Sequence, residues 1–266
     1  MADGTGIHWT NATINFVTGC SHAGSSGCDN CYAKLMTKRL QAIGQEKYRH
    51  GFDKVVCHDD PKLLSQFARW KRPRKIFVNS MSDTFHDDVP FEFIDKMYKS
   101  MLDAPQHLYQ ILTKRPENML RYLSSVPFAV PPNIWHGVTV EDQRSADRRI
   151  PILLECPSPM RFLSCEPLLS GVYIGLGGVG QGGWHWTDSD SLPLVIVGGE
   201  SGPNARPMHT EWVERIVKQC KDSGAKCFVK QMGTVWAKEN NSQSRKGDIM
   251  EEWPVGIRIR EEFDAS

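Results

Sequence analysis

The stretch KIFVNSMSDTFHDDVPFEFIDKMYKSMLDA, residues 75–104, contains a short apolar run, a polar turn and an amphipathic segment, in that order. The run KIFV is rich in β-branched and aromatic residues and ends abruptly in polar ones, as a buried strand does. In the second half, apolar residues recur three or four positions apart, at Phe93, Ile94, Met97, Met101 and Leu102. This spacing predicts a helix with one buried face. Residues 75–104 are therefore predicted to form one strand followed by one helix.

Seven other apolar runs along the chain end in polar residues in the same way. Together the eight runs lie at 7–20, 54–60, 75–85, 108–116, 134–142, 160–168, 194–202 and 226–233. Helical patterns fall between some of them at 61–70, 143–149 and 210–225, the last with Gly224 as its C-cap. Strands that alternate with helices predict parallel βα units, and eight such units in 266 residues predict a (β/α)8 TIM-type barrel. An open, doubly wound sheet is the alternative.

We expect a single barrel domain over residues 1–266, with two departures from the regular repeat. The first is a Gly- and Trp-rich insertion at 171–190, between strands six and seven, and the second is a C-terminal extension at 236–266. The insertion contains GLGGVG, which fits the G-x-G-x-x-G dinucleotide fingerprint, but no helical pattern follows it. We therefore expect a flexible segment whose Trp184 and Trp186 stack on a base, seal a pocket or simply anchor the loop.

The composition limits the classes of protein to which the chain can belong. Its formal net charge of +1 gives no global reason to bind nucleic acid, membrane or acidic partners, although a local basic patch is compatible with it. The basic run KRPRK at 71–75 is expected to be a solvated loop. No stretch approaches the roughly 20 apolar residues that cross a bilayer, and the N-terminus lacks signal-peptide order. We expect a cytoplasmic protein with no membrane partner, in which clustered cysteines serve metal or redox chemistry.

Acidic and basic residues gather directly after the apolar runs. In a parallel barrel the carboxyl ends of the strands carry the active site, so these residues predict a lined pocket on one rim. The candidate catalytic residues among them are Glu166, Glu200 and Lys230. A carboxylate just beyond an apolar strand is costly to bury without a partner. Ion pairs with Lys114, Arg115, Arg206 or Lys230 would supply one, so a structural role and a ligand-binding role both stay open.

Three cysteines lie in the stretch GCSHAGSSGCDNCYAK, residues 19–34, with the spacing C-x7-C-x2-C. Thiolates are soft ligands that favour zinc, copper(I) or iron–sulfur clusters. A structural zinc site needs a fourth ligand, for which the candidates are His22, His58 and His86, and no second C-x2-C pair is present. A four-iron cluster held by three cysteines instead leaves one iron open to a substrate or cofactor. We favour a [4Fe–4S] cluster with the ligands Cys20, Cys28 and Cys31.

This loop resembles that of the radical S-adenosylmethionine enzymes, in which three cysteines after the first strand of a full or partial (β/α) barrel hold a [4Fe–4S] cluster. CDNCYA matches the second half of their usual C-x3-C-x2-C signature, whereas the first gap here is seven residues long. The resemblance implies that the unique iron chelates S-adenosylmethionine, whose reductive cleavage yields a 5′-deoxyadenosyl radical. A Gly-Gly-Glu motif at 198–200 also occurs in that superfamily, but after its second strand, so its role there is not carried over.

A wider resemblance covers most of the chain. IHWTNATINFVTGC, ILTKRP, GVTVED, FLSCEPLL and VGGESG are similar to the motifs of a phage- and prophage-associated family of unknown function, noted for three cysteines. This resemblance implies a barrel, of the TIM type or a radical-SAM-like variant of it, and radical chemistry. The implied partners are S-adenosylmethionine and an electron-donor protein. The substrate stays open among a nucleobase, a nucleic acid and a peptide, and the phage setting favours nucleobase or DNA modification.

If S-adenosylmethionine binds on the rim, its carboxylate needs a cation and its ammonium needs a carboxylate or backbone carbonyls. Arg115 and Glu200 are the candidates for these two roles. The full set of candidate cofactor-binding residues is Asn79, Ser80, Asp83, Lys114, Arg115, Glu141 and Glu200. Two other classes stay open: a zinc-stabilised barrel hydrolase or lyase that uses the acids at the strand ends, and a non-enzymatic module that binds nucleic acid or protein.

Overall fold

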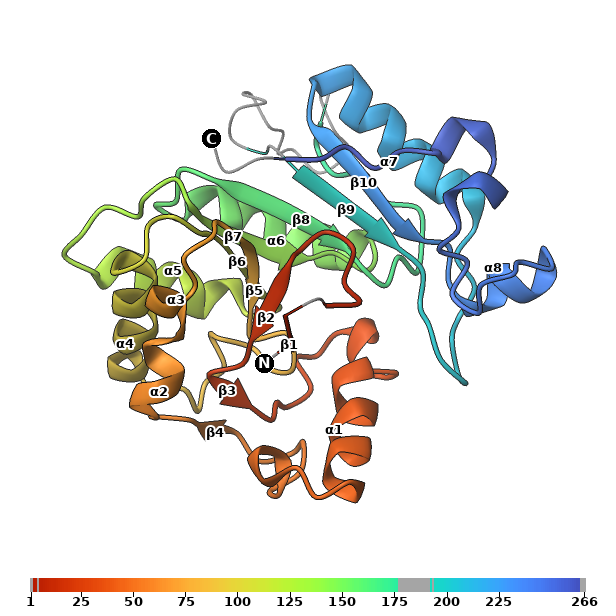
Figure 1. Cartoon of the computed structure of the whole chain (residues 1–266). Coiled ribbons are helices and arrows are strands. Elements are labelled where there is room, and N and C mark those ends of the chain that lie inside the picture. Colours follow the sequence, from red (N-terminus) through yellow and green to blue (C-terminus); the bar gives the residue numbers. More distant parts are fainter. Residues whose placement is uncertain (1, 4, 177–191, 193, 264–266) are drawn as a thin grey trace.

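Strands and helices alternate along the chain in a computed structural model, which describes residues 2–3, 5–176, 192 and 194–263 (Figure 1). The strands are β1 Ala2–Asp3, β2 Ala12–Ile14, β3 Val17–Thr18, β4 Val56–Cys57, β5 Lys75–Val78, β6 Leu108–Thr113, β7 Ile134–Thr139, β8 Arg161–Cys165, β9 Leu194–Gly198 and β10 Lys226–Gln231. The α-helices are α1 Tyr32–Ala42, α2 Pro61–Leu64, α3 Gln66–Arg69, α4 Phe91–Leu102, α5 Pro116–Ser125, α6 Gln143–Glu155, α7 Thr210–Ser223 and α8 Thr234–Glu239.

One sheet organises the fold, with the strand order β1-β2-β5-β6-β7-β8-β9-β10. The seven strands β2 and β5 to β10 run parallel to their neighbours, and β1 is antiparallel to β2. The sheet is curled into a half-barrel (Figure 1). Parallel sheets bury both faces, and the strands β7 and β9 are buried at every position. The predicted architecture of parallel βα units is confirmed.

The prediction of a barrel strand at 54–60 is wrong. Its strand β4 pairs antiparallel with β3 in a separate two-stranded sheet, with Val17 opposite Cys57. Val56 and Cys57 are only half-buried, whereas a strand inside a parallel sheet has both faces covered. The described residues therefore supply seven parallel strands and form an open half-barrel instead of a closed eight-stranded barrel.

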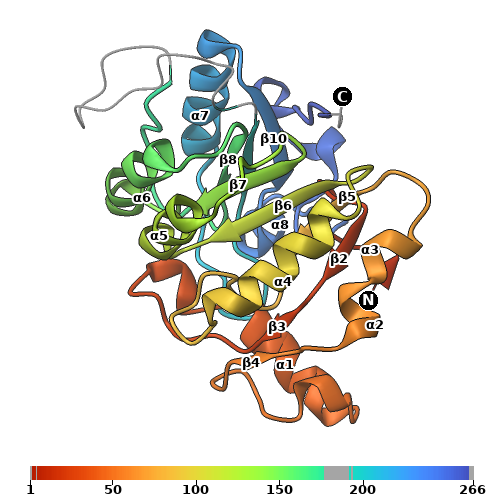
Figure 2. The ribbon, with the colours of Figure 1, turned by 90° about the vertical axis from the view of Figure 1, so that its left-hand side faces the viewer.

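Helices α4, α5, α6 and α7 cover the outer face of the curled sheet, which Figures 1 and 2 show from two sides. The helices predicted at 61–70, 143–149 and 210–225 are confirmed, the first as the short helices α2 and α3. Gly224 ends α7 in the left-handed conformation with a φ of 77°, as a C-cap does. Within the described ranges, no helix has the length and apolar character needed to cross a bilayer.

The prediction of a buried face on α4 is confirmed at four positions and wrong at one. Phe93, Ile94, Met97 and Met101 are buried in the main core. Leu102 is exposed instead, because it is the last residue of the helix and the adjacent Met101 already takes the core position.

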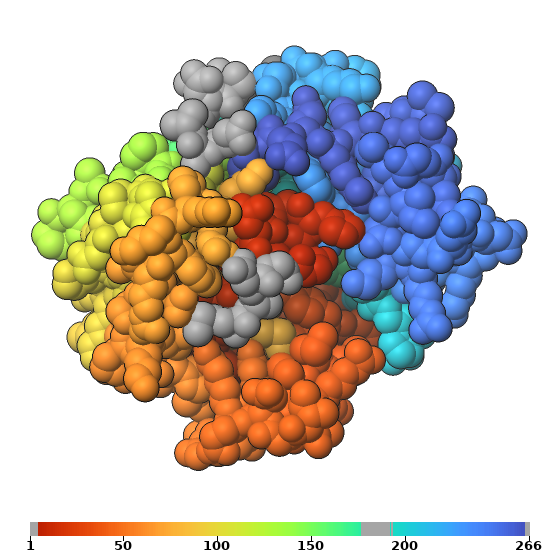
Figure 3. Space-filling view, viewed as in Figure 1, coloured from red at the N-terminus to blue at the C-terminus, as the bar shows by residue number. Residues whose placement is uncertain are grey.

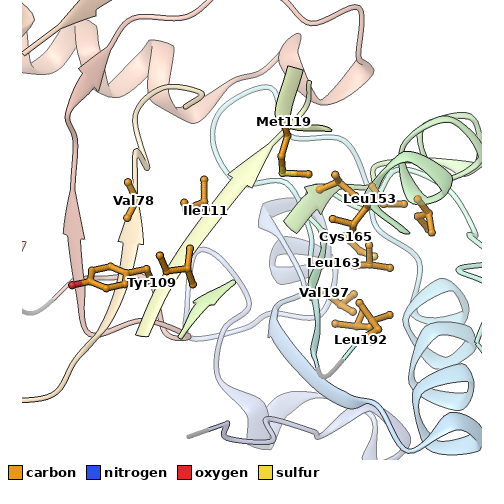
Figure 4. Packing of buried hydrophobic residues seen from close by; sticks show 14 of the residues in the cluster. Val78, Tyr109, Ile111, Met119, Leu153, Leu163, Cys165, Leu192 and Val197 are labelled. Atoms are coloured by element: carbon orange, nitrogen blue, oxygen red, sulfur yellow. The ribbon is translucent and has the colours of Figure 1, made fainter. Parts of the chain in front are cut away.

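The main hydrophobic core lies between the sheet and these helices. Figure 4 shows part of it, with Leu163 and Cys165 of β8 near Val197 of β9 and Leu153 of α6. All four side chains are fully buried. Burial raises the pKa of the Cys165 thiol far above its ordinary value. The sequence places Cys165 at a strand end and leaves three roles open for it: a fourth cluster ligand, a radical relay or a buried residue. The structure places its side chain in the core.

The concave face of the half-barrel holds a second, mainly aromatic cluster. Its buried members are Trp9, Phe77, Leu108, Trp135, Phe162, Leu194, Ile196, Phe228 and Phe263. The ring centroids of Trp9 and Phe77 are 4.8 Å apart, and Phe162 lies 6.4 Å from Trp9. Figure 3 shows the N-terminal residues, in red, between the orange and blue parts of the molecule. Leu108 and Leu194 begin their strands, so the cluster fills the amino end of the half-barrel and leaves the carboxyl end for a site.

Both edges of the sheet are covered by other parts of the chain. At one edge β1 pairs with β2. At the other, residues 259–261 run beside β10: Val229 N donates to Ile259 O at 2.9 Å, and Glu261 N donates to Cys227 O at 3.1 Å. These bonds belong to the predicted C-terminal extension, and they occupy backbone groups that would otherwise pair with another chain.

The predicted insertion at 171–190 lies outside the described residues from position 177 onward, and with it Trp184 and Trp186. Its first residues pack on the main core, where Val172 and Ile174 are fully buried. Gln219 of α7 fixes this segment, since its side chain donates to Val172 O at 3.1 Å.

Phe162 is the residue whose truncation tests the role of the aromatic cluster. Its ring takes the space beside Gly137, where a Cβ atom would lie 2.6 Å from the ring. We expect Phe162→Ala to lower the free energy of unfolding by about 3–5 kcal/mol, measured by urea denaturation, because it leaves a cavity in a buried layer. Val255→Ala is the control: Val255 is 81% exposed, and its truncation should change stability by less than about 0.5 kcal/mol. Equal effects of the two variants would contradict a stabilising role for the cluster.

Candidate functional site

The residues that the sequence places on a rim lie at the carboxyl ends of the parallel strands. In chain order they are Asn79 and Ser80 after β5, Asp83 in the turn that follows, Lys114 and Arg115 after β6, Glu141 after β7, Glu166 after β8, Glu200 after β9 and Lys230 near the end of β10. Because the strands are parallel, these ends meet at one edge of the half-barrel. Three of them, Arg115, Glu141 and Glu200, contact the cysteine loop, residues 19–31.

The cysteine loop begins and ends at fixed points. Gly19 has a φ of 83°, and a Cβ atom on it would lie 2.0 Å from the carbonyl oxygen of Lys54, so only glycine fits at the start. A 3-10 turn at Ser26–Cys28 precedes the end, where Cys31 caps α1. Three thiols of this loop are free and partly exposed, those of Cys20, Cys28 and Cys31.

Arg115 anchors the start of the loop. Its guanidinium donates to Cys20 Sγ at 3.7 Å, to Ser21 Oγ at 2.9 Å and to Asp83 Oδ2 at 3.3 Å. Asp83 in turn accepts a hydrogen bond from Thr113 Oγ1 at 2.7 Å. Burial and the nearby Asp83 raise the pKa of the Cys20 thiol to about 11, against the opposing effect of Arg115. A metal bound here has to displace that proton, because the thiolate is the ligand.

Glu141 holds the middle of the loop. Its fully buried carboxylate accepts hydrogen bonds from Ser25 Oγ at 2.5 Å and from Arg149 Nη1 at 2.7 Å, and it forms a second ion pair with Lys114. A Cβ atom on Gly27 would lie 2.6 Å from Glu141 Oε1. The loop backbone therefore rests directly on this carboxylate.

The charge of Glu141 is set by its partners. Burial alone would raise the pKa of this carboxyl group, but Lys114 and Arg149 outweigh burial and hold the pKa below its ordinary value of 4.5. Glu141 is therefore ionised at neutral pH. Removing one member of a buried ion pair leaves an uncompensated charge and costs about 3–5 kcal/mol.

Glu200 and Arg206 hold the end of the loop. Glu200, which is 5% exposed, accepts hydrogen bonds from Arg206 Nη2 at 2.7 Å and from Asn30 Nδ2 at 3.1 Å. The same Arg206 nitrogen donates to Ser26 O at 2.8 Å, and Nη1 lies 3.4 Å from Asp29 Oδ2. Burial would raise the pKa of Glu200, but the bonds from Arg206 and Asn30 lower it overall. This pair thus ties the strand end after β9 to both sides of Cys28.

Lys230 and Glu166 form an ion pair separate from the loop. The Lys230 Nζ to Glu166 Oε1 distance is 2.9 Å, and both side chains are partly exposed. Gly198 makes room for this carboxylate, since a Cβ atom there would lie 2.6 Å from Glu166 Oε1. Among the described residues Lys230 Nζ has this one partner, so two of its three N–H donors stay available. The pair can therefore bind or protonate a molecule at the mouth of the half-barrel.

Asn79 and Ser80 are occupied by contacts within the chain. Asn79 Oδ1 accepts from the backbone N–H groups of Phe16 at 2.8 Å and Val17 at 3.1 Å, which holds the turn between β2 and β3. The carbonyl oxygen of Ser80 accepts a hydrogen bond from the hydroxyl of Tyr32, the first residue of α1. These two residues therefore support the framework of the rim.

The three histidines considered as a fourth metal ligand have oxygen partners. His22 Nε2 lies 3.1 Å from Asp29 Oδ1, His58 Nε2 lies 2.8 Å from Thr18 Oγ1, and His86 Nε2 lies 2.7 Å from Ser21 Oγ. In the part of the chain that the structure covers, no set of three His, Cys, Asp or Glu residues is gathered closely enough to hold a single metal ion.

The chemistry of the donor set fits an iron–sulfur cluster. Three free thiols stand partly exposed on one docked loop, and they are soft ligands of the kind that iron–sulfur clusters require. Closed zinc sites draw four ligands to within about 2.3 Å of one ion, whereas a cluster brings its own iron and sulfide to fill the space between the thiolates. Cys20, Cys28 and Cys31 are thus the residues that would hold a cluster.

Sequence reasoning missed Ser25, Asn30 and Arg149. For Arg149 a signal exists: it lies on the same helical face as Ala146, Ile150 and Leu153, all of them buried. An arginine at a core-facing position of a predicted helix requires a buried anion, and Glu141 is one of the two carboxylates that directly precede this helix. Ser25 and Asn30 lie in a loop without periodic pattern, so no comparable signal identifies them.

Gly27 offers a direct test of loop docking. An alanine methyl group at this position would meet the Glu141 carboxylate, so Gly27→Ala should lift the loop from the rim. We expect the backbone amides of residues 25–31 to exchange with deuterium about ten-fold faster, which corresponds to about 1.4 kcal/mol of local stability. Gly6→Ala is the matched control, because Gly6 has open space around it and no positive φ. Unchanged exchange in Gly27→Ala would argue against the contact with Glu141.

The pKa of Glu141 predicts how stability varies with pH. Because this pKa is lower in the folded protein than the ordinary value of 4.5, the stabilisation from the carboxylate is fully present above pH 4.5 and is lost as pH falls below it. Glu141→Gln should therefore be less stable than the wild type by about 3 kcal/mol at pH 6–7, and the difference should shrink as the pH falls below 4.5. Urea denaturation of both proteins across this range measures it, and titration of the other carboxyl groups cancels in the difference.

Glu239→Gln is the control for this measurement, because Glu239 is exposed at the end of α8. Its difference from the wild type should stay below about 0.5 kcal/mol at every pH. A deficit in Glu141→Gln that is independent of pH would mean that Glu141 acts through its shape and not through its charge.

Comparison with known proteins identifies the family of this chain. Residues 4–254 match the model of a family described as a protein of unknown function, DUF5131. No curated protein and no solved structure matches the chain. The matched region includes the cysteine loop and every parallel strand of the half-barrel. The chain therefore belongs to the DUF5131 family.

Proposed function

We propose that this protein is a radical S-adenosylmethionine-type enzyme that holds a [4Fe–4S] cluster through Cys20, Cys28 and Cys31. The observation that carries the proposal is the docked loop with three partly exposed thiols at the carboxyl rim of a parallel half-barrel. The first cysteine follows the first parallel strand, which is the arrangement expected from the resemblance in the sequence. When bound, such a cluster supplies one electron to S-adenosylmethionine and so starts radical chemistry on a substrate.

The residues of the chain have three roles in this proposal. Arg115 keeps a positive charge beside Cys20 Sγ, which favours the thiolate over the thiol. Glu141 and the Glu200–Arg206 pair hold the loop in one place on the rim. Since these carboxylates are already paired, they are positioning residues. An ordered loop lowers the entropy lost when a cofactor binds.

Lys230 and Glu166 are the groups best placed to contact a substrate. They form the rim pair that no loop contact occupies, and Lys230 keeps free N–H donors. A lysine of this kind binds an anionic or carbonyl oxygen, and the neighbouring carboxylate can accept a proton. We place substrate recognition at this pair, next to the proposed cluster.

Iron content after anaerobic reconstitution with ferrous iron and sulfide tests the proposal. We expect a brown protein with about four irons per chain and a visible charge-transfer absorbance. Cys20→Ala, Cys28→Ala and Cys31→Ala should each retain less than about one iron per chain. Adding S-adenosylmethionine should change the electron paramagnetic resonance spectrum of the reduced wild-type protein, and with dithionite as the electron source the cofactor should be cleaved.

Cys57→Ala is the matched control, because Cys57 is a free and partly exposed thiol outside the loop. It should bind as much iron as the wild type. A colourless protein with about one zinc per chain would support a zinc-stabilised enzyme in place of this one. Full iron binding by all three loop variants would show that the loop cysteines do not hold the cluster.

A further inference from the structure

The charge of the protein is unevenly distributed. Residues 32–54, which we call the α1 lobe, contain six Lys or Arg residues and two Asp or Glu residues, a formal charge of +4. The whole chain has a formal charge of +1, so the remainder carries −3. The lobe directly follows the cysteine loop, and Figure 1 shows α1 apart from the helices that cover the outer face of the sheet. A local cationic surface is therefore hidden in a nearly neutral total.

Two of the three cations of helix α1, Lys38 and Arg39, are free of carboxylate partners among the described residues. The two acidic residues of the lobe pair with Lys34 and Arg49, at exposed positions where such pairs contribute little. Lys38 and Arg39 of α1 are exposed, and within the described residues neither side chain forms an ion pair. Helix α1 itself contains no acidic residue. Its positive charge is thus available to an anion from outside.

Helix α1 also turns its large apolar side chains outward. Its buried residues are the small Ala33 and Thr37. Tyr32, Leu35 and Met36, spaced three and four residues apart, are 52%, 44% and 40% exposed, although this spacing usually forms the buried face of a helix. An exposed apolar stripe between cations marks a surface for a partner that is both anionic and apolar.

The stripe begins at the candidate site. Tyr32 follows Cys31 directly, and its hydroxyl donates to the carbonyl oxygen of Ser80 on the rim. The ring of Tyr32 therefore lies at the junction between the outer face of α1 and the rim. A chain-like partner lying along α1 would pass the mouth of the half-barrel, where the Lys230–Glu166 pair lies.

From this arrangement we infer that the α1 lobe binds single-stranded nucleic acid and leads it to the rim. Lys38 and Arg39 neutralise phosphates, Tyr32 stacks on an unpaired base, and Leu35 and Met36 cover the sugar and base faces that follow. A single strand fits better than a duplex, because bases within a duplex do not present their faces for stacking and cannot enter a rim site. The binding surface stands independently of the cluster, and the conclusion that the bound strand is the substrate rests on the proposed function.

Fluorescence anisotropy with a labelled 20-nucleotide thymidine oligonucleotide tests this inference. The full-length protein should bind it at low salt, and log Kd should change linearly with log salt concentration. Lys38→Glu combined with Arg39→Glu should weaken binding at least ten-fold. Loss of two phosphate contacts should also flatten the salt slope by roughly 1.4, at about 0.7 per contact with a single strand. Lys218→Glu with Lys221→Glu, two exposed lysines on α7, makes the same charge change elsewhere and should leave Kd within two-fold.

Tyr32 separates stacking from charge. Tyr32→Ala should weaken binding about ten-fold while keeping the salt slope of the wild type, because it removes a stacking partner and no charge. Tyr32→Phe keeps the ring and should bind as the wild type does. A duplex of the same length should bind more weakly than the single strand.

Three outcomes would overturn the inference. Equal affinity for polyglutamate would identify an acidic protein as the natural partner, and binding to vesicles of anionic phospholipid without binding to the oligonucleotide would identify a membrane surface. Equal weakening by the α7 and α1 charge reversals would mean a non-specific effect of net charge. The iron content of the Lys38/Arg39 variant should equal that of the wild type, so a failure of the cluster and a failure of nucleic-acid binding give different results.

Discussion

A carboxylate with no exposure to water, that of Glu141, sits at the mouth of the half-barrel because three separate parts of the fold bring partners to it. Lys114 comes from the end of β6, Arg149 from α6 and Ser25 from the cysteine loop. The desolvation of this charge is expensive, so each partner is required where it stands. The consequence is structural as well as electrostatic, because one charge joins a strand end, a covering helix and the loop. The positions of the loop thiols are therefore set by the sheet and not by the loop.

The framework of this arrangement is readable from the sequence. Apolar runs that end in polar residues predict parallel strands with a lined rim, and the structure has both. Among the described residues the barrel is not closed, because the run at 54–60, although its composition is adequate, is only half-buried and pairs locally with β3. Composition records the apolar character of a strand but not what lies against it. For the same reason the sequence identifies Glu141 and Glu200 as site residues but does not show that both carboxylates form hydrogen bonds with the loop. Their partners Ser25 and Asn30 lie in a segment with no periodicity, and the contacts span more than a hundred residues.

Net charge is a poor guide to partners when the charge is segregated. The formal total of +1 argues against nucleic acid only if the charges are mixed over the surface. Here Lys38 and Arg39 stand on an outward-facing helix, whereas the rim carboxylates are each paired with a cation of their own. Electrostatic attraction falls off over roughly 10 Å at 0.1 M salt, so a polyanion responds to the nearest lobe and not to the sum over the chain. In helix α1, too, the sequence pattern does not predict burial: its apolar residues have the spacing of a buried face, but they are exposed.

The width of the rim explains why seven residues separate Cys20 from Cys28. Their contacts reach from Arg115, after β6, to Arg206, which is bonded to Glu200 after β9. Neighbouring strands are about 4.8 Å apart, so three steps from β6 to β9 cover about 14 Å. From Ser21 to Ser26 the backbone has five steps of at most about 3.5 Å each, or roughly 17 Å, which is enough. Measured in the same way, a gap of three residues would offer one such step, about 3.5 Å, which is less than the spacing of two neighbouring strands. A loop that holds its first cysteine beside β6 and its second beside Arg206 therefore needs a longer first gap than the three-residue spacing it resembles.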